Sequence, residues 1–204
     1  MKRVFLSIAF ILFLIISFPV FAQKAPEGFL DIKWGTTKEE IMKMLGARPS
    51  DSLDFYRILD MGDRIHFNPG YNIDSDQKWH RIGEVMVTEY NFSFSKLGKF
   101  YKASVNFPKI TLEPPHNFDI LLNALTTKYG SPKRTTPLVL KINPKARVGT
   151  QYEWIIENKV EITLWYNDME QMGINGTLVY TYLPIMREIE KKRDKDVAKT
   201  RDKL

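Results

Sequence analysis

The sequence has no cysteine among its 204 residues. This absence excludes disulfide bonds, thiol catalysis, zinc sites built from cysteine and the lipid-bearing cysteine of a bacterial lipoprotein. The folded part must therefore be stabilised by packing alone, which a domain of this size can achieve. Secreted eukaryotic domains more often carry disulfides, so the absence favours a bacterial envelope as the setting.

Motifs for catalysis and metal binding are also missing. The chain has no Gly-x-Ser-x-Gly elbow, no glycine-rich phosphate loop and no His-Glu-x-x-His. None of its three histidines, His66, His80 and His116, has a histidine partner three or four positions away. The sequence therefore predicts no catalytic residue, no metal ligand and no cofactor. A hydrolase whose site is assembled from distant segments is the alternative that this reasoning leaves open.

The N-terminus has the three-part pattern of a secretory signal peptide. Lys2 and Arg3 precede an apolar run to Val20, Pro19 interrupts the run, and Ala22 supplies a small residue at a cleavage site. Residues 1–22 are therefore expected to be removed. The alternative is an uncleaved membrane anchor, although the run is somewhat short for one. We expect a periplasmic or secreted protein without stable membrane insertion after cleavage.

The positive charge is concentrated at the two ends of the chain. The formal net charge is +6, to which Lys2 and Arg3 contribute two, and residues 187–204 contain eight basic and five acidic side chains. The body between these ends is close to neutral. Because no basic face is concentrated in this body, nucleic acid is not expected as a partner.

Two halves of the chain follow the same order of predicted elements. Residues 36–45 and 116–129 have helical apolar spacing, and both helices end at a glycine followed by proline. Thr36 and Glu39 fit a capping box for the first helix. Alternating strands follow each helix. The pattern predicts an α+β fold, a tandem repeat of a helix followed by an antiparallel β meander.

The expected boundaries are a first αβ unit at 23–110, a second at 111–183 and a charged C-terminal helical tail at 184–204. Within the first unit, residues 23–29 are expected to form a flexible lead. In the tail, only Ile185, Ile189 and Val197 keep apolar spacing. Because this stripe is thin, the tail is expected to be solvated and not to lie on a membrane surface.

The first helix and its turn resemble a motif of small bacterial envelope proteins. The residues are Gly35-Thr36-Thr37-Lys38-Glu39-Glu40-Ile41, followed by Leu45-Gly46 and Pro49. This segment resembles proteins of the SmpA/OmlA type, and the order of elements is similar to the tandem αβ fold of β-lactamase-inhibitor proteins. The resemblance implies a protein that is not an enzyme and that binds another envelope protein. The chain differs from the lipoproteins in lacking the anchor cysteine.

Three residues are candidates for binding. Trp79 and His80 follow a polar loop and are suited to present an aromatic and a titratable group to a ligand; the alternative is that the tryptophan anchors the loop. Trp165 lies opposite the apolar positions Ile162 and Leu164, so an outward ring is expected there. In the same polar loop, Asn72, Asp74 and Asp76 alternate like calcium ligands, but the glycine and glutamate of an EF-hand are missing.

Overall fold

The computed structural model describes residues 23–46, 58–69, 77–108, 116–139, 147–167 and 174–201. The predicted signal peptide at 1–22 lies outside these ranges, as do Asn72, Asp74 and Asp76 of the calcium-like pattern. None of the helices within them combines the length and apolar character that crossing a bilayer requires.

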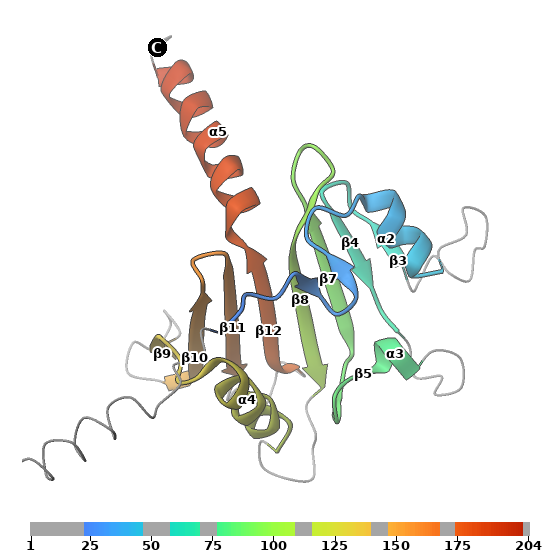
Figure 1. Ribbon diagram of the computed structural model, residues 1–204, viewed down its shortest axis with the longest axis vertical. Helices are drawn as coiled ribbons and strands as arrows, with labels where there is room; N and C mark the ends of the chain where they lie inside the picture. The colour runs from blue at the N-terminus through green and yellow to red at the C-terminus, as the bar shows by residue number, and fades with distance from the viewer. Residues whose placement is uncertain are drawn as a thin grey trace, which may run out of the picture.

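The described part of the chain is built on one antiparallel sheet of eight strands (Figure 1). Two short hairpins, β1–β2 and β5–β6, and the helices accompany this sheet. From edge to edge the strands are β3 (Ile58–Asp60), β4 (Arg64–Phe67), β7 (Glu89–Phe94), β8 (Phe100–Pro108), β12 (Ile174–Tyr182), β11 (Val160–Asn167), β10 (Arg147–Ile156) and β9 (Arg134–Val139).

The predicted tandem repeat of a helix and a meander is wrong. Strand β8 pairs with β12 along a ladder that includes Val105 opposite Leu178 and Lys102 opposite Thr181, so a single sheet runs through the whole described fold. The protein is mostly β. Alternation along a strand indicates which side chains point inward, but it does not indicate the partner strand. Strand β12 comes last in the chain yet lies in the middle of the sheet, a non-local pairing without a local signal.

The first face of the sheet carries the core. Apolar side chains stand directly opposite one another across six strands: Ile65, Phe92, Ala103, Tyr180, Ile162 and Trp154. Five of these six are buried and Tyr180 packs against them. The predicted inward positions Val160, Ile162 and Leu164 on β11 are confirmed as buried.

Short helices and hairpins cover this first face. Helix α4 (His116–Tyr129) turns Leu121, Leu125 and Tyr129 into the core, as its predicted stripe requires, and Figure 1 shows it on the near side of the sheet. The remaining elements are β1 (Gly28–Phe29), β2 (Ile32–Lys33), α2 (Lys38–Met44), α3 (Gln77–His80), β5 (Arg81–Ile82) and β6 (Val85–Met86).

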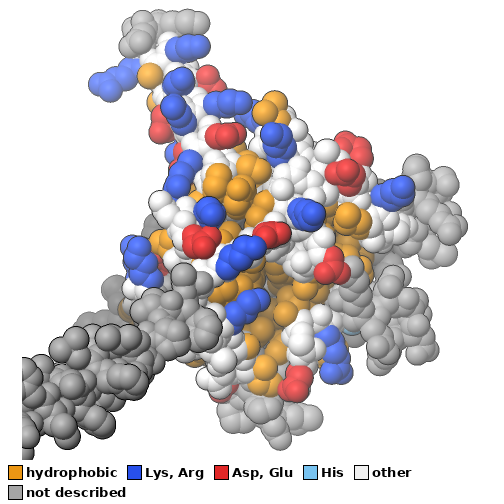
Figure 2. Space-filling view, in the orientation of Figure 1, with side chains coloured by type: hydrophobic (Ala, Val, Ile, Leu, Met, Phe, Trp, Pro, Cys, Tyr) orange, Lys and Arg blue, Asp and Glu red, His pale blue; other side chains and the backbone are white. Residues whose placement is uncertain are grey.

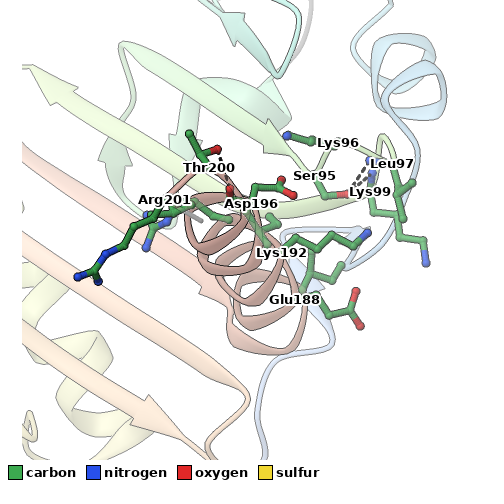
Figure 3. A pocket seen from close by; sticks show the side chains of 13 residues that line it. Ser95, Lys96, Leu97, Lys99, Glu188, Lys192, Asp196, Thr200 and Arg201 are labelled. Atoms are coloured by element: carbon green, nitrogen blue, oxygen red, sulfur yellow. Dashed lines mark hydrogen bonds between the residues drawn. The ribbon is translucent and has the colours of Figure 1, made fainter. Parts of the chain in front are cut away.

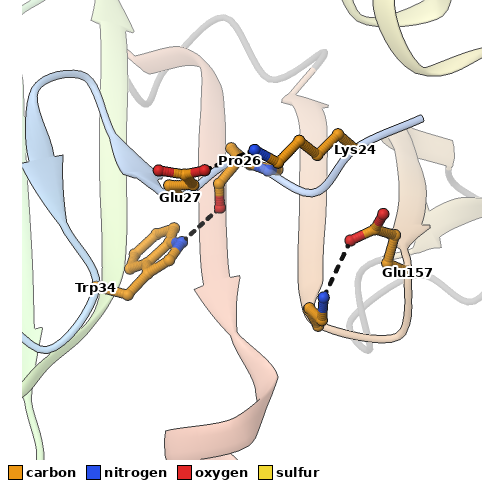
Figure 4. A network of polar contacts seen from close by, with 6 residues as sticks. Lys24, Pro26, Glu27, Trp34 and Glu157 are labelled. Carbon is orange, nitrogen blue, oxygen red and sulfur yellow. Dashed lines mark hydrogen bonds and ion pairs between the residues drawn. The ribbon is translucent and has the colours of Figure 1, made fainter. Parts of the chain in front are cut away.

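The segment expected to be a flexible lead is instead fixed to the fold. Ala25 and Phe29 are buried, and the indole Nε1 of Trp34 donates a 2.9 Å hydrogen bond to the carbonyl oxygen of Pro26. Figure 4 shows this bond beside the ion pair of Lys24 with Glu27. The prediction missed that β1 and β2 form a hairpin, in which Phe29 is buried.

Helix α2 begins one residue later than predicted. The Thr37 side chain accepts from the backbone N–H of Glu40, and the Glu40 carboxylate accepts from the backbone N–H of Thr37. The sequence Thr-Thr-Lys-Glu-Glu fits a capping box in either register. The backbone decides between them, because the carbonyl oxygen of Thr36 accepts a hydrogen bond from Phe100 of β8.

Helix α5 (Leu183–Arg201) follows β12 directly and extends beyond the end of the sheet (Figure 1). Its first backbone N–H, at Leu183, donates to Lys159, and Arg187 binds the Asn158 side chain, so its start is tied to the β10–β11 turn. None of its described residues is buried. The helix is therefore attached at one end and partly to fully exposed along its length.

Candidate functional site

The second face of the sheet is polar and forms the candidate site. Trp165 stands opposite Gln151 on β10 and Thr177 on β12, and Thr177 stands opposite Asn106 on β8. The described elements α3, α4 and β1–β2 contact first-face side chains. Of the polar side chains on the second face, Glu153, Thr177 and Thr181 are buried, whereas Gln151, Thr163, Ser104 and Lys102 are partly exposed. Two further cross-strand rows run parallel to this one and contain Glu153, Thr163, Val179, Ser104, Asn91 and His66, and then Glu161, Thr181, Lys102, Ser93 and Arg64.

Charges of both signs are distributed over this second face. Its described positions include the basic residues Arg64, Lys102 and Arg134 and the acidic residues Glu89, Glu153 and Glu161. Arg134 lies 3.5 Å from Glu153 across the β9–β10 pair. The face is therefore electrically balanced, as suits a protein surface better than a polyanion such as nucleic acid.

A hydrogen-bonded group occupies the β4–β7 side of the same face. The Glu89 carboxylate accepts a 2.6 Å hydrogen bond from the Asn91 side chain and lies 3.2 Å from Nδ1 of His66. Because Asn91 also contacts the histidine ring at 3.3 Å, the three side chains hold one another in place. This arrangement presents ordered polar groups without requiring a bound ligand.

Two carboxylates lie close together near the other edge. Glu161 and Glu153 are diagonal neighbours on β11 and β10. Burial raises the pKa of Glu161, and the nearby Glu153 raises it further, while Lys102 and Arg134 oppose the shift. Paired carboxylates with separated protonation are a feature of acid–base sites. Here Glu153 pairs with Arg134, and neither carboxylate lines the two hollows described below.

Trp165 lies where the alternation predicts, on the opposite side of β11 from Ile162 and Leu164. It is partly exposed, whereas Trp154 on the neighbouring strand is 1% exposed and donates a 2.8 Å hydrogen bond to Gly130. The two tryptophans of this hairpin therefore differ in role: Trp154 is a core residue and Trp165 is available at a surface.

Trp79 belongs to the core and not to this site. It is 4% exposed, and its ring contacts Phe67, Tyr90 and Phe92 at centroid distances of 5.6 to 6.3 Å. The structure therefore shows Trp79 packed in the core, while residues 70–76 of the loop that it was expected either to present or to anchor lie outside the described residues. His80 ends the same short helix and is partly buried. The structure does not bring Trp79 to Trp165, since the two rings lie on opposite faces of the sheet.

A cleft of about 530 Å³ opens on the first face, between the β1–β2 hairpin and α4. Its apolar lining includes Phe29, Ile32, Leu178 and Tyr180. Figure 2 shows apolar side chains gathered along the middle of this face between charged ones. Its charged residues, Glu27, Asp31, Lys33 and Lys128, balance one another, so the lining does not select a ligand of one charge.

Sequence reasoning missed most of the second-face residues. It gave no role to Glu153, Glu161, Lys102, Arg134 or His66. The sequence does contain one signal for these residues, because the polar positions of each alternating strand point to the same face. What it could not supply is the β8–β12 pairing that joins the polar rows of the two halves.

Comparison with known proteins gives little similarity. No protein family model matches the chain, and no curated protein matches it. A crystal structure of a DUF4309 family protein, YjgB from Bacillus subtilis, is similar at 11% identity, over 78% of this chain and 88% of that chain, with a TM-score of 0.41. This similarity does not assign the chain to that family.

Proposed function

We propose that the protein is an exported, non-enzymatic binding protein that engages another envelope protein through the second face of its sheet. The observation that carries the proposal is the position of Trp165, a partly exposed aromatic ring on a face whose described side chains are mostly polar. Tryptophan is enriched among the residues that dominate binding energy at protein interfaces. A pre-formed sheet face also loses little conformational entropy on binding.

The charge pattern supports a protein partner of mixed charge. Arg64, Lys102 and Arg134 lie at well-separated positions on β4, β8 and β9, and acidic residues lie between them. Such a pattern fixes how the two partners align and excludes wrong partners, and it contributes less to affinity. A partner with alternating charges of its own fits this face, whereas a uniformly charged ligand meets repulsion at half of the positions.

Export is part of the proposal and rests on the signal-peptide pattern at residues 1–22 and on the resemblance to envelope proteins. The test is N-terminal sequencing of the protein recovered from its native cell. A mature chain that starts at Gln23 supports export, and recovery from the cytoplasm with Met1 in place contradicts it.

Binding is tested by crosslinking the tagged protein in its envelope fraction and identifying the captured protein. Trp165→Ala should reduce recovery of that partner by at least about tenfold, as truncation of a central interface aromatic does. Met86→Ala is a matched control, because Met86 is also exposed but lies on β6. Equal recovery with both variants would contradict the role of the second face.

A cell-envelope hydrolase is the second candidate, favoured by the raised pKa of Glu161 beside Glu153. This function requires a protonated Glu161 to donate a proton to a leaving group. Glu161→Gln would then abolish hydrolysis of glycan or peptide cell-wall fragments. The binding proposal expects no such hydrolysis by the wild-type protein.

A further inference from the structure

A groove lies at the end of the sheet, between helix α5 and the β7–β8 turn. The two walls leave adjacent strands at the same end, since α5 continues β12 and the turn at residues 95–99 leads into β8. The space between them is about 780 Å³ (Figure 3). This groove lies beyond the second face and shares no residue with the rows that contain Trp165.

The turn that forms one wall is held by its own hydrogen bonds. The backbone N–H of Ser95 donates to Lys99, that of Gly98 donates to Ser95, and the Ser95 hydroxyl accepts from the backbone N–H groups of Leu97 and Lys99. Gly98 has φ of 69°, which a glycine adopts without strain. The wall is therefore ordered before any partner arrives.

Exposed apolar side chains line both walls of the groove. Among the exposed large apolar side chains of the described ranges, Leu97 at 66% and Val197 at 62% are the two most exposed, and both line this groove. Ile185 and Ile189 extend the apolar stripe along α5. Apolar side chains concentrated in one hollow, with none of α5 buried, indicate a surface that a partner covers.

The rim of the groove is basic. Two acidic side chains, Glu188 and Asp196, line it, whereas five basic ones do: Lys96, Lys99, Lys192, Arg193 and Arg201. An excess of positive charge around the apolar side chains of the groove attracts an apolar surface with acidic flanks.

We propose that this groove binds an amphipathic helix of a partner protein whose apolar stripe is flanked by aspartate and glutamate. A helix lying alongside α5 would bury the stripe of both in the manner of helix-in-groove recognition. The 19 residues of α5 span roughly 28 Å, enough to pair with about five turns of a partner helix.

The same observations argue against two other occupants. A second copy of this chain would bring its own basic α5 against a basic rim, which is repulsive. A bilayer offers one flat surface, whereas the apolar side chains of the groove lie on two walls, helix α5 and the 95–99 turn. The proposal therefore concerns a partner helix, and dimerisation or vesicle binding are outcomes that would contradict it.

The probe is a pair of labelled peptides of about 18 residues, long enough to form a helix in a groove. Both carry leucine at i, i+3, i+4 and i+7, and they differ only in having glutamate or lysine at the flanking positions. Fluorescence anisotropy with the purified protein should show binding of the glutamate peptide at least about tenfold tighter than binding of the lysine peptide, with weakening as salt rises.

Variants locate the binding on the groove. Leu97→Ser combined with Val197→Ser should weaken binding of the glutamate peptide at least about tenfold. Lys192→Glu should weaken it as well, whereas Lys195→Glu makes the same charge change on α5 outside the groove lining and should alter binding much less. Hydrogen exchange of the α5 amides should slow in the complex, since a covered helix opens less often.

Binding of neither peptide, equal binding of both, or equal loss with Lys195→Glu would overturn the proposal. Concentration-dependent dimerisation that Leu97→Ser abolishes would instead assign the groove to a second copy. Binding to vesicles of anionic phosphatidylglycerol without peptide binding would assign it to a membrane. Trp165→Ala is expected to leave peptide binding unchanged, so failure here and failure of the second-face proposal are distinguishable.

Discussion

The ring of Trp34 stacks on the ring of Tyr182 with a centroid distance of 5.7 Å and an interplanar angle of 7°. Trp34 also stacks on Phe100, at 5.1 Å. Since Tyr182 ends β12 and Phe100 begins β8, this one indole contacts both strands at the junction of the two halves of the sheet. The segment before α2 thus stabilises the pairing on which the continuous sheet depends.

Trp34→Ala should lower the free energy of unfolding by about 2–3 kcal/mol, because it removes two ring contacts and the hydrogen bond to Pro26. Trp34→Phe keeps part of the stacking and should cost about 1 kcal/mol. Urea unfolding followed by circular dichroism measures both. A loss below 0.5 kcal/mol, roughly the limit for an ordinary surface position, would contradict the role of Trp34 at this junction.

Thr37→Ala should cost about 1 kcal/mol, the usual contribution of a helix N-cap hydroxyl. Thr36→Ala is the matched control, since the adjacent threonine contributes its backbone carbonyl to the Phe100 bond and not a capping hydroxyl. Urea unfolding of the two variants decides between the registers. A larger loss with Thr36→Ala would restore the cap that the sequence pattern first suggested.

The two tryptophans of the β10–β11 hairpin should respond very differently to truncation. Trp154→Ala should cost about 3–5 kcal/mol, because it leaves a core cavity and an unsatisfied Gly130 carbonyl. Trp165→Ala should cost no more than about 1 kcal/mol, because its ring is partly exposed on the second face. Similar losses from both variants would place Trp165 in a core and remove it from the candidate site.

Glu161 should make stability depend on pH in the unusual direction for a carboxylate. Its pKa is raised by burial and by Glu153, so above that pKa the folded state holds the charged form at a cost. Between the unfolded pKa of about 4.5 and the raised folded value, the folded state binds more protons, and the free energy of unfolding falls as pH rises.

Glu161→Gln should therefore be more stable than the wild type near pH 7, and the difference should disappear below about pH 4.5. Glu40→Gln provides the contrast. Hydrogen bonds from Thr37 lower the Glu40 pKa, so the wild-type carboxylate stabilises the fold above its unfolded pKa, and that stabilisation is lost on acidification. Denaturant unfolding across this pH range tests both, and equal signs for the two variants would contradict the electrostatic account.

The sequence was informative wherever the pattern is local. The stripe of α4 and the alternation of β11 correctly separate Leu121 and Ile162 from Trp165. The sequence did not predict burial that depends on contacts between distant segments. Phe29 packs against Tyr180 of β12 and Tyr90 of β7, and Trp79 packs against Phe67 of β4 and Tyr90 of β7, all contacts between separate elements of the fold. The polar rows of the second face required the β8–β12 pairing, which no periodicity encodes.

The central claim, that the second face binds a partner protein, is tested most directly by placing a photocrosslinking amino acid at single positions of the protein in its native cell. Thr163 and Gln151 flank Trp165 on the second face, and Met86 is exposed on β6, which packs on the first face. The account predicts one crosslinked protein from positions 163 and 151 and its absence from position 86. Crosslinks to that protein from position 86 alone would contradict the account.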